Sequence, residues 1–208
     1  MQHDITKLCA DSLRSYLNDN HGIKLKSGHA HEIVAAFFGY KSKIALLADK
    51  RYPLGDLGKA EFILLTPPTP FVDQRIKSLE GLPPELPPSY ILAEGVYRVI
   101  TGDRALLEKI QPSFQDLAVS LGEECLHRRM KPLGINPKDL QSIANVEMEA
   151  TEAEVSLTVT FDSPVSSKVE IRLPRMAGNI GYGKPEIAPT FYTGQMRDPD
   201  FRLKHGIA

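Results

Sequence analysis

The sequence predicts an α+β fold with a helical N-terminal unit, a helical middle and a small antiparallel β-sheet. Apolar residues recur at helical spacing near the N-terminus and again over residues 113–130. Two later segments alternate apolar and polar residues, which is typical of half-buried strands. We therefore expect a helical unit over residues 1–52 and an α+β region over residues 53–208, in which helices pack on one sheet.

The N-terminal unit begins with a predicted helix over residues 4–20, which the stretch NDNHG ends. An extended link follows, and Ser27 is the expected N-cap of a second helix that ends at Gly39. Ser42 can cap a third helix. The apolar stripe of the first helix is formed by Ile5, Leu8, Cys9, Leu13, Tyr16 and Leu17.

The middle of the chain combines one buried strand with several helices. The stretch KAEFILLT, residues 59–66, is short and almost continuously apolar, which predicts a buried strand that PPTP ends. Four prolines in GLPPELPPS, residues 81–89, indicate a stiff polyproline-like connector and a possible domain boundary. The predicted helices cover residues 89–100, 103–110 and 113–130, and NPKDL starts another with Asn136 as its cap and Pro137 in its first turn.

The clearest β pattern predicts an antiparallel hairpin over about residues 154–173. EVSLTVTF and KVEIRL both alternate apolar and polar residues, and polar DSPVSS lies between them. NVEMEA can add a third strand. No regular pattern follows Pro174, so residues 174–208 are expected to form an aperiodic C-terminal arm.

Composition excludes several classes of protein. The 25 Lys and Arg residues balance 26 Asp and Glu residues, so no global basic field attracts nucleic acid, although residues 1–52 have 8 basic and 5 acidic side chains. Two cysteines cannot make a disulfide framework. No apolar run approaches the roughly 20 residues of a membrane-spanning helix. We expect a soluble protein of the reducing cytoplasm that does not engage a membrane.

Residues 29–50, HAHEIVAAFFGYKSKIALLADK, raise the question of a helix-turn-helix. Ala35 and Gly39 suit such a motif, with a small residue in the first helix and glycine at the turn. The positions that would face a DNA groove include Leu46 and Leu47, and leucines discriminate bases poorly because base edges are distinguished mainly by hydrogen bonds. The polar residues at the same positions are Lys41, Ser42 and Lys43.

We therefore favour a packed corner over a DNA-binding motif. In this interpretation Gly39 ends the second helix, and Ile44 and Leu47 pack inward. DNA binding remains the alternative. The basic stretch HRRMK, residues 127–131, could add phosphate contacts through Arg128 and Arg129, but cations at a helix C-terminus also offset the helix dipole without any ligand.

The stretch from Leu13 to Leu46, LRSYLNDNHGIKLKSGHAHEIVAAFFGYKSKIAL, resembles a small helical domain of bacterial glyoxalase-related proteins and of some plasmid- or phage-encoded proteins. The shared rhythm is a helix, a G-x-x-L-S link, an A-x-E-L-x-A helix and G-Y. It covers residues 5–50, about the first quarter of the chain. The resemblance implies a bacterial accessory protein of the kind that mobile elements also encode, and it transfers no catalytic or metal-binding residue.

GNIGYGKP, residues 178–185, matches the P-loop pattern G-x-x-x-x-G-K, but Pro185 stands where a Ser or Thr should bind magnesium. A P-loop also joins a parallel strand to a helix, whereas this segment follows a predicted antiparallel hairpin. We expect a glycine-rich turn.

A zinc site drawn from two histidine- and cysteine-containing pairs is also not expected. The members of each pair are one residue apart, and side chains at i and i+2 of a helix point to different faces. Cys125 is better explained as a core residue. We therefore predict no catalytic residue, no metal and no cofactor. The pairs are His29 with His31 and Cys125 with His127.

These observations together predict a non-catalytic binding or adaptor protein that acts through protein–protein contacts or self-association. Aromatic side chains in irregular segments suit interfaces. The predicted contact residues are Tyr182, Phe191 and Tyr192, although their rings could instead pack on the protein's own sheet. The alternative is a nucleic-acid-binding regulator that uses the helix-turn-helix-like stretch.

Overall fold

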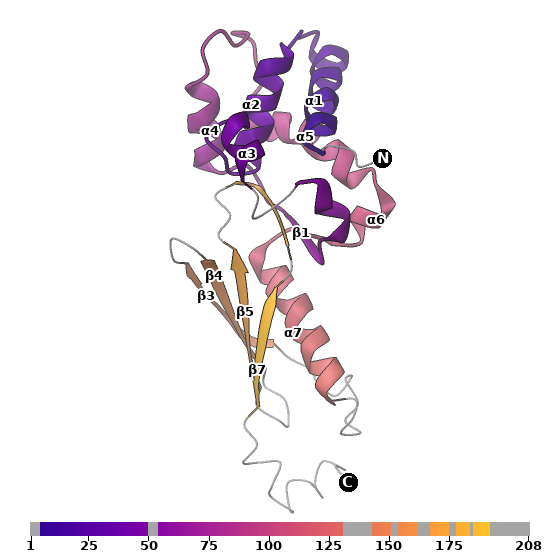
Figure 1. Ribbon diagram of the computed structural model, residues 1–208, viewed down its shortest axis with the longest axis vertical. Helices are drawn as coiled ribbons and strands as arrows, with labels where there is room; N and C mark the ends of the chain where they lie inside the picture. Colours follow the sequence, from indigo (N-terminus) through magenta and orange to yellow (C-terminus); the bar gives the residue numbers. More distant parts are fainter. Residues whose placement is uncertain are drawn as a thin grey trace, which may run out of the picture. The chain divides into compact units, whose positions relative to one another are not determined.

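A computed structural model gives the protein an α+β architecture, as the sequence predicts (Figure 1). By its internal contacts the chain divides into two compact units. The first comprises Met1–Pro112 with Met176–Lys184, and the second comprises Ser113–Arg175 with Pro185–Ala208. The boundary expected after residue 52 lies inside the first unit. The structure describes residues 5–49, 54–130, 143–150, 154–161, 167–174, 178–183 and 185–191.

The first unit is a helical layer with a three-stranded sheet. Helix α1 contacts both α2 and α5, and α2 also contacts α3 and α4. The shared core is lined by side chains such as Leu13, Leu17, Ile33, Phe37 and Leu92, all fully buried. The helices are α1 (Ile5–His21), α2 (Ser27–Phe37), α3 (Lys43–Ala48), α4 (Pro70–Lys77), α5 (Ser89–Thr101) and α6 (Arg104–Leu107), with a 3-10 helix η1 (Leu54–Lys59).

Helices α1 and α2 follow the predicted pattern, with one correction at a cap. Helix α2 begins at Ser27 itself, and Lys26 occupies the N-cap position without a side-chain hydrogen bond to the helix. The carbonyl of Ser27 lies 2.8 Å from Nδ1 of His31, one helical turn later. Ser27 is therefore the first helical residue, and its prediction as the N-cap was wrong.

The end of α2 confirms Gly39 as the helix stop. Gly39 has a φ of 84°, in the left-handed region that glycine adopts without strain. Its N–H donates to the Ala36 carbonyl and the Tyr40 N–H donates to the Ala35 carbonyl, both at 2.9 Å. This pair of bonds is a Schellman motif, which satisfies two of the last free carbonyls of the helix.

The three-stranded sheet has the order β2-β1-β6. Strand β1 (Phe62–Leu65) lies in the centre, parallel to β2 (Ile110–Gln111) and antiparallel to β6 (Ile180–Gly183). Its first three residues are all buried, which explains why the sequence there is continuously apolar rather than alternating. The predicted strand at 59–66 is confirmed, although its first residue belongs to η1.

The middle helices agree with the sequence except at one place. Helices α5 and α7 (Phe114–Met130) match the predicted ranges closely. The expected helix over 103–110 is only the short α6, capped by Asp103, because Ile110 leaves the helical path to pair with Ile63 of β1. The proline-rich residues 81–89 lie within the first unit. The helix expected at Asn136 falls outside the described residues.

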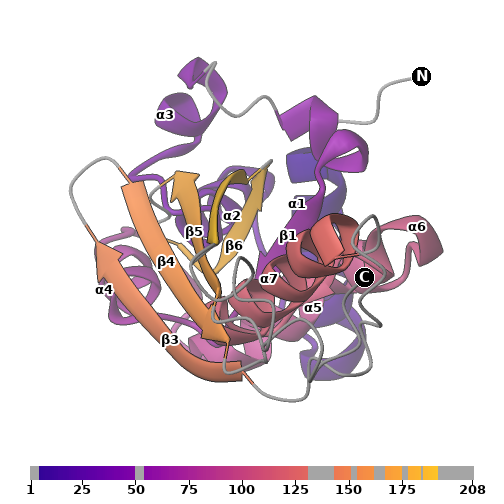
Figure 2. The ribbon, with the colours of Figure 1, turned by 90° about the horizontal axis from the view of Figure 1, so that it is seen from below.

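The second unit packs helix α7 on a four-stranded antiparallel sheet of order β3-β4-β5-β7. Strands β3, β4 and β5 lie side by side in Figure 2, and β7 lies beside β5 in Figure 1. The hairpin of β4 (Glu154–Phe161) and β5 (Ser167–Pro174) confirms the prediction, and β3 (Ile143–Ala150) is the third strand. The buried face of the hairpin is formed by Val155, Leu157, Val159, Val169, Ile171 and Leu173. Leu117 and Ala118 of α7 are buried as well.

The C-terminal arm is not wholly aperiodic, which corrects the prediction for residues 174–208. It contains β6, which pairs with β1 of the first unit, and β7 (Glu186–Phe191), which pairs with β5 of the second. Neither strand has an alternating sequence. Strand β6 is glycine-rich and short, and β7 tolerates Pro189 because it lies at the edge of the described sheet.

Strand β6 joins the first unit by docking on the C-terminus of α2. The N–H of Asn179 donates to the Phe37 carbonyl at 2.7 Å. A Cβ atom at Gly178 would lie 2.2 Å from the Gly39 nitrogen and 2.4 Å from the Phe37 carbonyl oxygen, closer than real contacts allow. Glycine is therefore required at position 178 for this approach.

We expect Gly178→Ala to destabilise the first unit by about 1–3 kcal/mol, because the added methyl group overlaps backbone atoms that cannot rotate away. Urea unfolding followed by tyrosine fluorescence measures this, since six of the seven tyrosines belong to the first unit. Gly28→Ala is the matched control. A Cβ there meets nothing within 4 Å, so stability should stay equal or rise by up to about 1 kcal/mol. Equal stabilities for the two variants would contradict the close docking.

Candidate functional site

Polar contacts at the corner between α2 and α3 determine which side chains of α3 are exposed. Ser42 has an extended backbone, and its Oγ accepts a hydrogen bond from the Ala45 N–H at 3.1 Å. This confirms Ser42 as the N-cap of α3. Because the cap fixes where the helix begins, it also fixes which side chains face inward.

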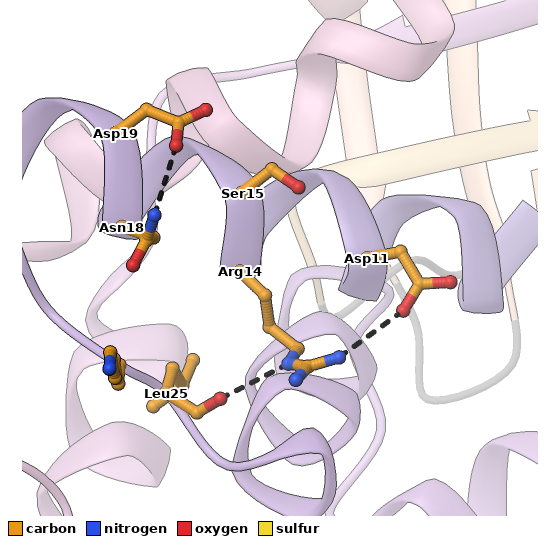
Figure 3. A pocket seen from close by; sticks show the side chains of 7 residues that line it. Asp11, Arg14, Ser15, Asn18, Asp19 and Leu25 are labelled. Carbon is orange, nitrogen blue, oxygen red and sulfur yellow. Dashed lines mark hydrogen bonds and ion pairs between the residues drawn. The ribbon is translucent and has the colours of Figure 1, made fainter.

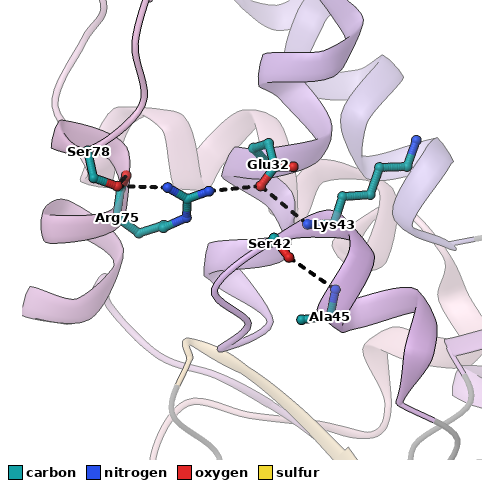
Figure 4. A network of polar contacts seen from close by, with 6 residues as sticks. All are labelled: Glu32, Ser42, Lys43, Ala45, Arg75 and Ser78. Atoms are coloured by element: carbon teal, nitrogen blue, oxygen red, sulfur yellow. Dashed lines mark hydrogen bonds and ion pairs between the residues drawn. The ribbon is translucent and has the colours of Figure 1, made fainter.

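A polar network holds the start of α3 against α2 and α4 (Figure 4). The guanidinium of Arg75 donates to Oε2 of Glu32 at 3.0 Å, and the backbone N–H of Lys43 donates to the same oxygen at 3.3 Å. Arg75 also donates to Oγ of Ser78 at 2.7 Å. Both ion-pair side chains are mostly buried, with exposed fractions of 21% and 26%. The Glu32 carboxylate therefore joins three helices at one point.

The other end of α3 is held as well. The Tyr40 hydroxyl donates to Oδ2 of Asp49 at 3.2 Å, and Asp49 is the C-cap residue of the helix. Between these two ends Leu46 is only 3% exposed and belongs to the core. Helix α3 is therefore short but fixed in place at both ends and in the middle.

The opposite face of α3 exposes two large apolar side chains. Ile44 is 79% exposed and Leu47 is 56% exposed. This overturns the prediction that Ile44 and Leu47 pack inward. Residues three apart share one face of a helix, and the side chain that packs inward is Leu46, which lies on the other face.

The sequence around α3 carries no clear signal for this exposure. An apolar residue before an N-cap often packs against the fourth residue after it, but Lys41 precedes Ser42 here and the fourth residue is Leu46. The burial of Leu46 is therefore set by the contact of α3 with the core of the first unit. The prediction of Ser42 as the cap is confirmed.

The residues proposed for nucleic-acid contact belong to two different units of the chain. Lys41 is exposed, and Ser42 uses its hydroxyl as a helix cap. Lys43 is half-buried and its backbone N–H is bonded to Glu32. Arg128 is exposed, pairs with Glu124, and belongs with Arg129 to α7 of the second unit.

The predicted aromatic contact residues also differ in their surroundings. Tyr182, in β6, is half-buried, and its ring meets that of Phe38 edge-on with centroids 6.4 Å apart. That ring therefore packs within the first unit. Phe191 is the last residue of β7 and pairs with Ser167, and Tyr192 lies outside the described residues.

The described part of the P-loop-like segment lacks the strand-to-helix turn that surrounds the phosphate in a P-loop. Residues 180–183 form β6, antiparallel to β1, rather than the glycine-rich turn that was expected. Its start is used structurally: Asn179 is buried, accepts from the Thr69 N–H at 3.1 Å and donates to the Thr66 hydroxyl at 3.2 Å. The side-chain amide of Asn179 also donates to the Pro67 carbonyl. These bonds leave little capacity for a ligand.

Two side chains that could take part in chemistry, Tyr97 and Cys9, instead pack in the core of the first unit. Burial raises the pKa of Tyr97, whose hydroxyl donates to the Thr66 carbonyl at 2.7 Å. Cys9 is buried, whereas Cys125 is only half-buried, so its prediction as a core residue is met in part. Among the described residues no group of three or more His, Cys, Asp or Glu side chains could hold a metal.

A polar surface hollow of about 530 Å³ lies along α1 and the link to α2 (Figure 3). Nε of Arg14 donates to the Leu25 carbonyl at 3.1 Å, and its guanidinium lies 3.7 Å from Asp11. Lys24 and Asp19 add one further charge of each sign. The opposed charges cancel, so the hollow favours neither an anionic nor a cationic ligand.

Comparisons with known proteins return no match: no family model, no curated protein and no solved structure is similar to this chain. None of the helices in the described ranges combines the length and the apolar composition that a bilayer crossing requires.

We expect Leu46→Ala to cost roughly 2–5 kcal/mol of stability, the range for truncating a buried leucine, while Leu47→Ala stays within about 0.5 kcal/mol. Urea unfolding by tyrosine fluorescence compares the two variants directly. Leu46 and Leu47 are neighbours in the same helix, so both variants change the helix propensity by the same amount. The difference in stability between them therefore reports the burial of the side chain. A larger loss for Leu47 would mean that α3 is rotated relative to this structure.

We also expect Mg-ATP to leave the melting temperature unchanged, because β6 offers neither a strand-to-helix turn nor a magnesium hydroxyl. A ligand at a hundredfold excess over its dissociation constant would add about 2.7 kcal/mol. Differential scanning fluorimetry with and without Mg-ATP tests this. An upward shift that Lys184→Ala abolishes would restore the P-loop interpretation.

Proposed function

We propose that this chain is a non-catalytic binding or adaptor protein and that the exposed face of α3 is its contact surface. The single observation that supports this most strongly is the pair Ile44 and Leu47, which are exposed on a helix that is otherwise held rigidly. An exposed apolar pair on a fixed helix loses little conformational freedom on binding, and burying it in a partner is favourable.

The surroundings of this pair favour a protein partner with an apolar groove and an acidic rim. Ala45 and Ala48 are also exposed. Because their side chains are short, the backbone of a partner protein can approach α3 closely beside the apolar pair. Exposed Lys41 precedes the helix and adds positive charge at its start. Charge complementarity of this kind guides encounter and register more than it adds affinity.

The same face argues against the alternative, a nucleic-acid-binding regulator. A helix that recognises bases presents hydrogen-bonding side chains to the groove, whereas α3 presents Ile44 and Leu47. Its six residues are also few for a recognition helix. Binding to a DNA duplex is therefore one of the outcomes that the experiment below distinguishes.

The cellular setting belongs to the proposal too. Two free cysteines suit a reducing cytoplasm. An accessory role in a bacterium, which the rhythm of residues 5–50 led us to expect, is part of the same proposal. A partner protein, or a second copy of the chain, is the expected binding partner.

The test compares Ile44→Asp and Leu47→Asp with Leu107→Asp, a change of the same kind at a 52% exposed leucine of α6. Each variant is used as bait in a bacterial lysate, with captured proteins identified and quantified, and its self-association is measured by sedimentation. We expect the α3 variants to lose the partner or the self-association and Leu107→Asp to keep it. Unchanged capture and self-association in all variants would refute the proposal. Binding to a DNA duplex that Lys41→Ala abolishes would instead support a nucleic-acid-binding regulator.

A further inference from the structure

Strand β3 lies at one edge of the four-stranded sheet and leaves one side of its backbone open (Figure 2). Within the described part of the chain β3 pairs with β4 alone. At the opposite edge β7 contains Pro189, which has no N–H to donate to a further strand. Strand β3 contains no proline, so its open side presents N–H and C=O groups with which an added strand can pair.

The apolar face of the sheet continues onto β3 and leaves Met148 exposed there. Met148 lies opposite Leu157 in the register and Val146 lies opposite Val159, so these four side chains share one face of the sheet. Leu157 and Val159 are fully buried, whereas Met148 is 59% exposed. An added strand with apolar side chains at the matching positions would bury Met148, which is favourable.

The polar face of β3 carries two acidic side chains that have no basic cross-strand neighbour in the described sheet. Glu147 lies opposite Thr158, and Glu149 lies opposite Ser156. Both glutamates are exposed, and Glu147 accepts a hydrogen bond from Asn145 at 3.0 Å. Opposite charges on neighbouring strands stabilise their pairing and like charges destabilise it. The open side of β3 therefore favours a strand with basic residues on this face over a second β3, which sets glutamate opposite glutamate.

The alternation of apolar and basic residues that β3 favours occurs in the sequence FRLK, residues 201–204, which lie outside the described part of the chain. The sequence IKLK, residues 23–26, has the same alternation. Its Ile23 and Leu25 are already buried in the core of the first unit, so this stretch is not available for pairing. The FRLK segment is therefore the occupant whose sequence fits the open side of β3.

The end of β7 determines the direction from which the FRLK segment reaches β3. Strand β7 ends at Phe191, which pairs with Ser167, and the register continues through Phe161 to Ile143 at the start of β3. A new strand beside β3 would lie about 19 Å from β7, because neighbouring strands are about 4.8 Å apart. Residues 192–200 can span about 30 Å when extended. A strand that enters from this end of the sheet runs parallel to β3.

We propose that the FRLK segment of the same chain adds a strand to the sheet, parallel to β3 on its open side. Each residue of the segment then lies beside a complementary residue of β3. The added strand covers Met148 and occupies the edge at which strands of other proteins would otherwise pair. The neighbours in this register are Phe201 with Val146, Arg202 with Glu147, Leu203 with Met148, and Lys204 with Glu149.

Hydrogen–deuterium exchange of the full-length chain, followed by mass spectrometry and expressed as protection factors, measures whether β3 is paired on both sides. Arg202→Glu combined with Lys204→Glu places like charges beside the glutamates of β3, so the protection of β3 should fall about tenfold. Glu147→Lys combined with Glu149→Lys should have the same effect. The chain with all four changes should recover the original protection, because the facing charges are again opposite.

Lys24→Glu combined with Lys26→Glu is the matched control, since it makes the same charge change in the IKLK stretch and should leave β3 unaffected. Strand β5 is paired on both sides, so its protection should stay constant in every variant and shows that the second unit remains folded. Protection of β3 that the charge reversals leave unchanged, or that the four changes together fail to restore, would overturn the proposal. So would protection that rises with protein concentration, because a second copy would then supply the strand.

Discussion

The first unit depends on the docking of residues 178 and 179 against the end of α2, where the Asn179 N–H donates to the Phe37 carbonyl. Phe37 is the last residue of α2, and the Schellman bonds at Gly39 leave its carbonyl available. Gly178 permits the approach because any Cβ there would overlap the backbone of this corner. Asn179 then bonds to Thr66 and Thr69, so it links the ends of α2, β1 and α4.

This junction explains why the chain enters the first unit twice. The segment Met176–Lys184 returns from the second unit and adds β6 beside β1. Strand β1 is buried and would lack a partner for one edge without it, and unpaired buried backbone groups are costly. The first unit is therefore complete only when a late part of the sequence has docked on an early one.

The α2–α3 corner shows how a few local bonds decide a surface. The Ser42 cap, the Glu32 carboxylate and the Tyr40–Asp49 bond fix the rotation of α3. Leu46 then turns inward, and the exposed pair is Ile44 and Leu47. The contact surface proposed for α3 depends on this arrangement, because the buried Leu46 anchors the short helix and leaves its other side exposed.

The sequence by itself determined the α+β class, the hairpin over 154–173, the buried strand β1 and the main helices. These depend on periodicity, caps and glycine stops, which act between residues close in the chain. It also identified Gly39 and Ser42 correctly. Tertiary structure decided the roles of β6 and the GNIGYGKP segment, because their partner β1 lies far earlier in the sequence. It also decided the role of β7, whose own sequence does not alternate and which pairs with β5. It likewise decided which of Ile44, Leu46 and Leu47 is buried, since a six-residue helix is too short for its own pattern to define an inward face.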